Sequence, residues 1–184
     1  MTFDYPGYQL KFIQKDACRD TSKHLFTLIY KFFSPVTKYH YIIKADYHEG
    51  DIFAVKFYCK KDRRSNYKYS KTVNRGDLGN IMISCFSVLP RIMQFYPNAS
   101  FAFIGAPSVD LKTKNKEKRP FTKRFAVYRY IASTIIGTKT FEHIEYEKVS
   151  GYMLINKLNE DIPGKETEFT SMFIETYSSL YEPL

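Results

Sequence analysis

The chain of 184 residues has no tryptophan and three cysteines, and it lacks any apolar run near the ~20 residues that a membrane-spanning helix needs. Cys18, Cys59 and Cys85 are far apart and show no C-x-x-C spacing, so neither a disulfide framework nor a structural zinc site is indicated. The first residues, MTFDYPG, contain neither the basic nor the apolar part of a secretion signal. We therefore expect a cytoplasmic protein with no membrane contact.

The motifs of the large enzyme families are also missing. The chain contains no G-x-S-x-G, P-loop, H-E-x-x-H or G-x-G-x-x-G pattern, and we expect no cofactor. A metal-independent ribonuclease would leave no such motif, because convergent side chains are enough to stabilise a phosphorane and move a proton. That alternative stays open, with Arg124, Tyr128, Arg129 and His143 as its candidate residues.

Hydrophobic residues make up 44% of the chain and aromatic residues 17%, which is the composition of a folded protein and not of a disordered one. A chain of this length has room for one sizeable core. We expect residues 1–184 to form a single domain.

The clearest periodic segment is Asp77–Tyr96, which predicts a helix with one continuous apolar stripe. Asp77 is expected to cap its start and Pro97 to end it, and the apolar run after Pro97 predicts a buried strand ending at Gly105. Pro90 removes one backbone hydrogen bond and should bend the helix near Phe86. The stripe consists of Leu78, Ile81, Met82, Cys85, Leu89, Ile92, Met93 and Tyr96.

Alternating segments on both sides of this helix predict strands. Tyr8–Gln14 is expected to place Leu10 and Phe12 inward, and His48-Glu49-Gly50 is expected to be a hairpin loop. Since most strands follow one another in hairpins, we expect an α+β fold: a mixed, mainly antiparallel sheet with two long helices packed on one face and a C-terminal helix. The further strands are expected at 24–33, where a short helix stays open, and at 38–47, 51–60, 140–148 and 152–157, and the further helices at 120–136 and 165–181.

The net charge of +9 is concentrated in two segments. Lys56–Arg75 holds eight basic residues against one aspartate, and Lys112–Arg124 holds seven against one glutamate. Such local basicity favours an anionic partner. The candidate binding residues are Lys60, Lys61, Arg63, Arg64, Lys112, Lys114, Lys116, Arg119, Arg124, Tyr128 and Arg129.

Together with nearby tyrosines, these segments predict a non-catalytic protein that binds nucleic acid or another polyanion. Two other interpretations stay open: ordinary solvated loops, and a protein-interaction module that meets an acidic partner. Arg124 and Arg129 lie five residues apart on the second predicted helix, so they do not share one face. One of the two could complete an anion site at the helix start, or extend from a packed face into solvent.

Three weaker patterns could carry chemistry. His143, Glu145 and Glu147 share one face of a predicted strand and could form a metal or acid–base cluster, but such residues are common on the solvent-facing side of an antiparallel strand. Asp110-Leu-Lys112 is similar to the end of a nuclease motif, but here it lies in a polar loop. The third pattern is a similar His/Asp/Glu group around the predicted hairpin loop, formed by His40, His48, Glu49 and Asp51.

The segment Phe95-Tyr-Pro-Asn-Ala-Ser-Phe-Ala-Phe-Ile-Gly105, continued by Arg124–Arg129, resembles a small bacterial family of unknown function with F-x-x-x-Y-P and R-x-R-L-Y-R motifs. In this chain Phe95 directly precedes the Tyr-Pro pair, Ala126 replaces the middle arginine, and 107–119 is an insertion. The resemblance implies a β-meander followed by helix, strand and helix. It also implies an association with toxin–antitoxin gene pairs.

Overall fold

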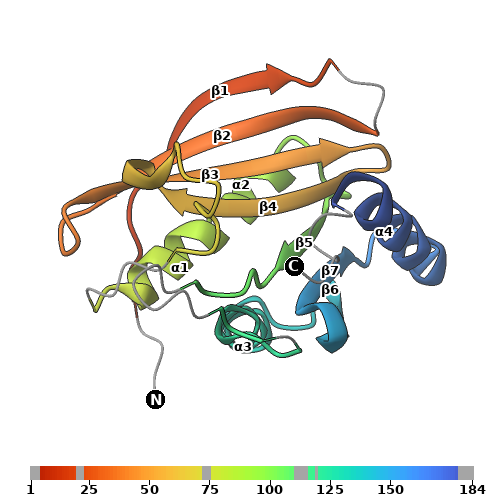
Figure 1. Cartoon of the computed structure of the whole chain (residues 1–184). Coiled ribbons are helices and arrows are strands. Elements are labelled where there is room, and N and C mark those ends of the chain that lie inside the picture. The colour runs from red at the N-terminus through yellow and green to blue at the C-terminus, as the bar shows by residue number, and fades with distance from the viewer. Residues whose placement is uncertain (1–4, 20–22, 72–75, 110–115, 119, 178–184) are drawn as a thin grey trace.

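The computed structural model describes residues 5–19, 23–71, 76–109, 116–118 and 120–177. Within them, seven strands form one sheet in the order β1-β2-β3-β4-β5-β7-β6, and Figure 1 shows β1 to β4 as long strands with β5, β7 and β6 beyond them. The pair β4 and β5 is parallel and every other neighbouring pair is antiparallel. The strands are β1 (Lys11–Ala17), β2 (His24–Ser34), β3 (Tyr39–His48), β4 (Ile52–Cys59), β5 (Ser100–Ile104), β6 (Phe141–Tyr146) and β7 (Gly151–Asn156).

Helices cover both faces of this sheet. The parallel pair β4–β5 needs a crossover, which α1 (Leu78–Phe86) and α2 (Val88–Met93) supply. These helices and α3 (Lys123–Ile131) pack on one face, whereas α4 (Ile162–Tyr177) packs on the other. The predicted α+β fold with a mixed, mainly antiparallel sheet and a C-terminal helix is therefore confirmed.

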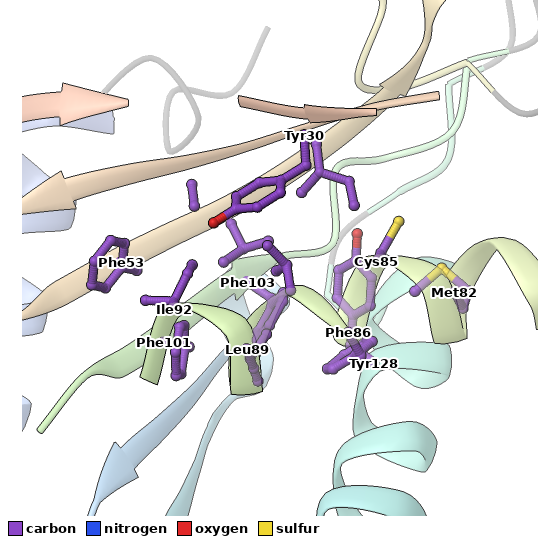
Figure 2. Close-up of a cluster of buried hydrophobic side chains, with 14 of the residues drawn as sticks. Tyr30, Phe53, Met82, Cys85, Phe86, Leu89, Ile92, Phe101, Phe103 and Tyr128 are labelled. Carbon is purple, nitrogen blue, oxygen red and sulfur yellow. The ribbon is translucent and has the colours of Figure 1, made fainter. Parts of the chain in front are cut away.

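The larger core lies between the sheet and the helices α1, α2 and α3 (Figure 2). Phe53 and Phe101 from the sheet are fully buried there, as is Phe125 from α3. Burial of each such ring contributes roughly 2–3 kcal/mol relative to leaving it in water. A smaller core under α4 contains Phe169, Met172 and Phe173 from the helix, packed on the other side of β4, β5 and β7.

The bend predicted in the central helix is confirmed. α1 ends at Phe86, α2 begins at Val88, and Ser87 separates them. Pro90 has no N–H to donate to the carbonyl of Phe86, so the α-helical ladder cannot continue through this point.

Asp77 starts α1, but the predicted side-chain cap is wrong. Its buried carboxylate instead accepts hydrogen bonds from the hydroxyls of Tyr8 and Ser34 and from the side-chain amide of Asn80. The carboxylate thus joins the N-terminal segment, the end of β2 and the first turn of α1. A buried carboxylate needs several hydrogen-bond donors, and meeting that need stabilises the fold more than a single capping bond at the helix start would.

The helix predicted for 120–136 is shorter than expected. α3 begins at Lys123, because the Thr122 side chain accepts a hydrogen bond from the backbone N–H of Phe125 and so caps the helix. A helix over 120–136 would place Phe121 on its inner face, but Phe121 instead precedes α3 with a φ of 71° and is 43% exposed. A π-helical turn at Ala132–Ile136 then turns Ile135 outward, where it is 46% exposed.

Two smaller expectations also need correction. Phe12 faces the same side as Tyr30, but β1 is an edge strand, so Phe12 is 50% exposed instead of buried. The turn Glu147–Val149 interrupts the predicted strand at 140–148, and Ser150 takes a left-handed backbone before β7. Among the described residues no helix has the length and apolar character to cross a bilayer.

Candidate functional site

The antiparallel pairing of β3 and β4 brings two basic stretches of the sequence together. Tyr41 lies opposite Cys59. Carried one residue further, this register sets His40 opposite Lys60, which begins the short 3-10 turn Lys60–Asp62. The end of β2 is there too, because Phe33 pairs with His40.

The side chains at this end of the sheet line a shallow hollow of about 450 Å³, which we call the cationic hollow. Among the residues that the structure describes, no carboxylate lines it. The nearby Asp62 is buried, and its carboxylate accepts a hydrogen bond from the Lys71 ammonium at 2.9 Å. The lining residues are Lys38, Tyr39, His40, Lys60, Lys61 and Arg63.

The four cations of the cationic hollow, Lys38, Lys60, Lys61 and Arg63, are exposed, and none of them forms an ion pair within the described part of the chain. The Lys61 ammonium lies 4.3 Å from the centre of the Tyr39 ring. The positive charges that line this one hollow repel one another. A bound phosphate would relieve that repulsion, and both lysine and arginine hydrogen-bond to phosphate oxygens.

The hollow continues onto the face of β1 to β4 that points away from α1 and α2, which we call the open sheet face. One row across all four strands runs from Lys11 through Lys31 and Ile42 to Tyr58. In the neighbouring row, Lys44 of β3 lies directly opposite Lys56 of β4. Like charges in cross-strand pairs repel one another, so the pairing of Lys44 with Lys56 does not itself stabilise the sheet.

Aromatic rings are interleaved with these cations. Phe33 is 44% exposed, and its ring centre lies 5.0 Å from that of His40. On β4, the Tyr58 ring packs edge-on against Tyr69 at 5.5 Å, and the Lys68 ammonium lies 5.3 Å from the centre of Tyr58. Burial raises the pKa of the Tyr58 hydroxyl, and the positive charge of Arg63 opposes that shift. An exposed aromatic ring on a solvent-facing sheet surface provides a flat apolar surface next to positive charge, on which a planar group such as a base can stack.

A buried polar cluster limits the open sheet face at the end covered by α4. The Asp46 carboxylate is paired with the Lys56 ammonium and accepts hydrogen bonds from Thr27 at 2.7 Å and Tyr177 at 3.0 Å. Burial opposes ionisation of Asp46, but the charge and hydrogen bond of Lys56 outweigh it and lower the pKa of the carboxyl group. Lys56 is therefore engaged inside the protein, in contrast to Lys11, Lys31 and Lys44.

Of the binding residues predicted in the first basic segment, three line the cationic hollow and one does not. It places Lys60, Lys61 and Arg63 together in the cationic hollow, whereas Arg64 is exposed beside it and does not line it. Sequence reasoning missed Lys38 and His40. The register of the predicted hairpin contained the signal. In a hairpin that turns at His48-Glu49-Gly50, the numbers of opposite residues sum to about 100, and residues 40 and 60 are such a pair.

Of the second basic segment, Lys112, Lys114 and Arg119 lie outside the described residues, as does the nuclease-like stretch Asp110–Lys112. Lys116 is exposed and forms an isolated bridge with Val109.

The two basic segments meet where the Arg124 side chain contacts the backbone of the first segment. Just before the second segment, the Val109 N–H also donates to the Ser70 carbonyl at 3.4 Å. The Arg124 guanidinium donates to the carbonyls of Tyr69 and, at 2.6 Å, Lys71. Arg124 therefore ties the end of the first segment to α3, away from the four cations of the cationic hollow.

The candidate residues for a ribonuclease fall into two groups. Arg124 and the buried Tyr128 line one cavity, whose lining does not include Arg129 or His143. Arg129 forms an ion pair with Glu145 at 3.1 Å. His143 uses both ring nitrogens, one with the Tyr152 hydroxyl at 2.8 Å and one with the Gly137 carbonyl at 2.7 Å. The structure therefore does not gather all four side chains in one cavity.

The two His/Asp/Glu groups noted in the sequence do not form a metal site in the part of the chain that the structure describes. Within the described residues, no three His, Cys, Asp or Glu side chains are placed to hold a metal ion. No disulfide joins Cys18, Cys59 and Cys85.

Comparisons with known proteins identify no relative: no protein-family model, no curated protein and no solved structure matches the chain. The resemblance to a bacterial family stays an untested expectation.

Proposed function

We propose that the protein binds single-stranded nucleic acid across the open sheet face and the cationic hollow, without a catalytic step. The observation that carries the proposal is the exposed Phe33 ring, packed against His40 beside four cations that have no carboxylate partner in the described residues. Backbone phosphates would lie along the cations while a base stacks on Phe33.

The exposed aromatic ring favours nucleic acid over an acidic protein. A carboxylate-rich partner would use the cations but gains nothing from a bare phenylalanine among them. Stacking of one base on an aromatic side chain contributes about 1–3 kcal/mol. The lysines supply attraction without sequence preference, so we expect little discrimination between DNA and RNA or between sequences. We also propose that the protein binds nucleic acid in the cytoplasm.

The test is binding of a fluorescent 20-nucleotide (dT) strand as a function of salt. Four phosphate contacts on a single strand predict a slope of about −3 in log affinity against log salt. Polyglutamate is the competitor that separates the alternatives. A flat salt dependence, or equal affinity for polyglutamate and the oligonucleotide, would contradict the proposal.

A double variant locates the binding surface. Lys60→Ala combined with Lys61→Ala should reduce the steepness of the slope by about 1.4, the loss of two phosphate contacts. The matched control is Lys139→Ala with Lys148→Ala, which removes the same charge from exposed positions next to β6. If both double variants weaken binding equally, net charge and not the cationic hollow is responsible.

A further inference from the structure

A second cavity, of about 350 Å³, lies on the opposite side of the sheet from the open sheet face. It exists because β4 pairs with β5 only from Ile52 to Ala54, so the second half of β4 leaves a gap toward α3. α1 and α3 close this gap on two sides. Its volume is at the lower end of the range for small-molecule sites.

The walls of this cavity are mostly apolar. Phe57 of β4, Met82 of α1 and Val127 of α3 line it, and Met82 is 2% exposed. Tyr128 lines the same space and is buried. Burial raises the pKa of Tyr128 to about 12, so its hydroxyl stays protonated and able to donate at neutral pH.

Within the described residues, one half-buried charge in the wall has no counter-ion. Arg124 is half-buried, its guanidinium carbon lies 6.0 Å from the centre of the Phe57 ring, and its described acceptors are two backbone carbonyls. The other two cations of the lining differ: Lys71 is paired with Asp62, and Lys123 is exposed to solvent. A half-buried charge without an anion costs free energy.

We infer that this cavity binds a compact aromatic anion, with its flat body between Phe57, Met82 and Tyr128 and its anionic group at the Arg124 guanidinium. Arginine has five N–H donors and uses two on the carbonyls, so donors remain for a carboxylate or a phosphate. The site is distinct from the proposed nucleic-acid surface, which lies on the other side of the sheet; of the residues named for that surface, Tyr58 alone also lines the cavity.

Methionine-methyl NMR on the full chain tests the inference directly. Adenosine monophosphate and indole-3-acetate are the probes, one for each source of the anion, and inorganic phosphate alone is the reference. Of the methionines that the structure describes, Met82 alone lines the cavity, whereas Met153 and Met172 belong to the core under α4. Either aromatic probe should shift the Met82 methyl signal and leave those of Met153 and Met172 in place.

Two substitutions on α3 provide the matched pair. Val127→Phe fills the cavity and should weaken binding at least 10-fold, whereas Ala126→Phe adds a ring at an exposed neighbouring position and should leave it unchanged. If Val127→Phe does not fold, the Met82 shift in the unmodified chain decides. The inference is overturned if neither aromatic probe moves Met82 at millimolar concentration, or if phosphate alone moves it equally.

Discussion

Tyr177, the last described residue of α4, donates its hydroxyl hydrogen to the Asp46 carboxylate of β3 at 3.0 Å, and the same oxygen accepts the Nε2–H of His48 at 3.1 Å. Burial and the Asp46 charge raise the pKa of the tyrosine hydroxyl, so it remains a donor throughout the physiological range. One hydroxyl thus fixes the end of the C-terminal helix to the sheet. It also fixes which nitrogen of His48 carries the proton.

The first prediction concerns this hydroxyl. Tyr177→Phe keeps the ring but removes a hydrogen bond to a buried carboxylate, and should destabilise the protein by about 1–3 kcal/mol. Urea unfolding measures the change as a lower midpoint at constant m-value. Tyr67→Phe, at a position 50% exposed, is the control and should change little. Equal stabilities of the two variants would show that the Tyr177 bond contributes nothing.

The second prediction is a loss of stability between pH 6.5 and about 4. Burial lowers the pKa of His48 from 6.5 to about 4, and the charges of His24 and Lys56 add to the shift while Asp46 opposes it. As the pH falls through this window, the unfolded chain binds a proton that the folded His48 does not, so folding becomes less favourable.

The expected loss is about 1–2 kcal/mol, since solvent near the partly exposed Lys56 screens some of the charge. Chemical denaturation at half-unit pH steps measures it, and His48→Gln should flatten the curve above pH 4. Asp46 acts separately, because its lowered pKa makes its stabilising contribution fall only at still lower pH. An unchanged pH profile in His48→Gln would assign the loss to another group.

The third prediction separates stacking from charge on the open sheet face. Phe33→Ala should weaken oligonucleotide binding about 5- to 150-fold, the range that loss of one stacked base implies, without changing the salt slope. Phe95→Ala is matched, because Phe95 is 80% exposed beyond α2 and away from the hollow. Fluorescence anisotropy measures both. Equal effects of the two substitutions would reject Phe33 as a stacking platform.

Local patterns in the sequence were enough to predict most of the fold and part of the candidate site. Alternation identified the β3–β4 hairpin, and its register already implies that residue 40 meets residue 60. Periodicity identified the apolar stripe of α4 but not the sheet face that it covers, so the meeting of Tyr177 with Asp46 could not be predicted. The Arg124 contact with the carbonyl of Tyr69 was likewise out of reach, because it depends on how an irregular loop packs.

The last prediction tests the junction between β5 and α3. Gly105 follows β5, and a Cβ atom there would lie 2.5 Å from the Thr122 hydroxyl and 2.6 Å from the backbone nitrogen of Phe125. The Thr122 hydroxyl already donates to the Gly105 carbonyl at 2.8 Å, so the helix start cannot retreat without losing that bond.

Gly105→Ala should therefore destabilise the protein by about 1–3 kcal/mol, the usual cost of overpacking. Gly151→Ala is the control: its nearest contact would be a Val149 methyl at 3.3 Å, a flexible neighbour that can give way. Thermal unfolding of both variants provides the comparison. Because Thr122 and Phe125 begin α3, Gly105→Ala should also move Arg124 and reduce the Met82 response to an aromatic anion, whereas Gly151→Ala should not. A destabilised Gly105→Ala variant with an unchanged Met82 response would show that the cavity does not depend on this helix start.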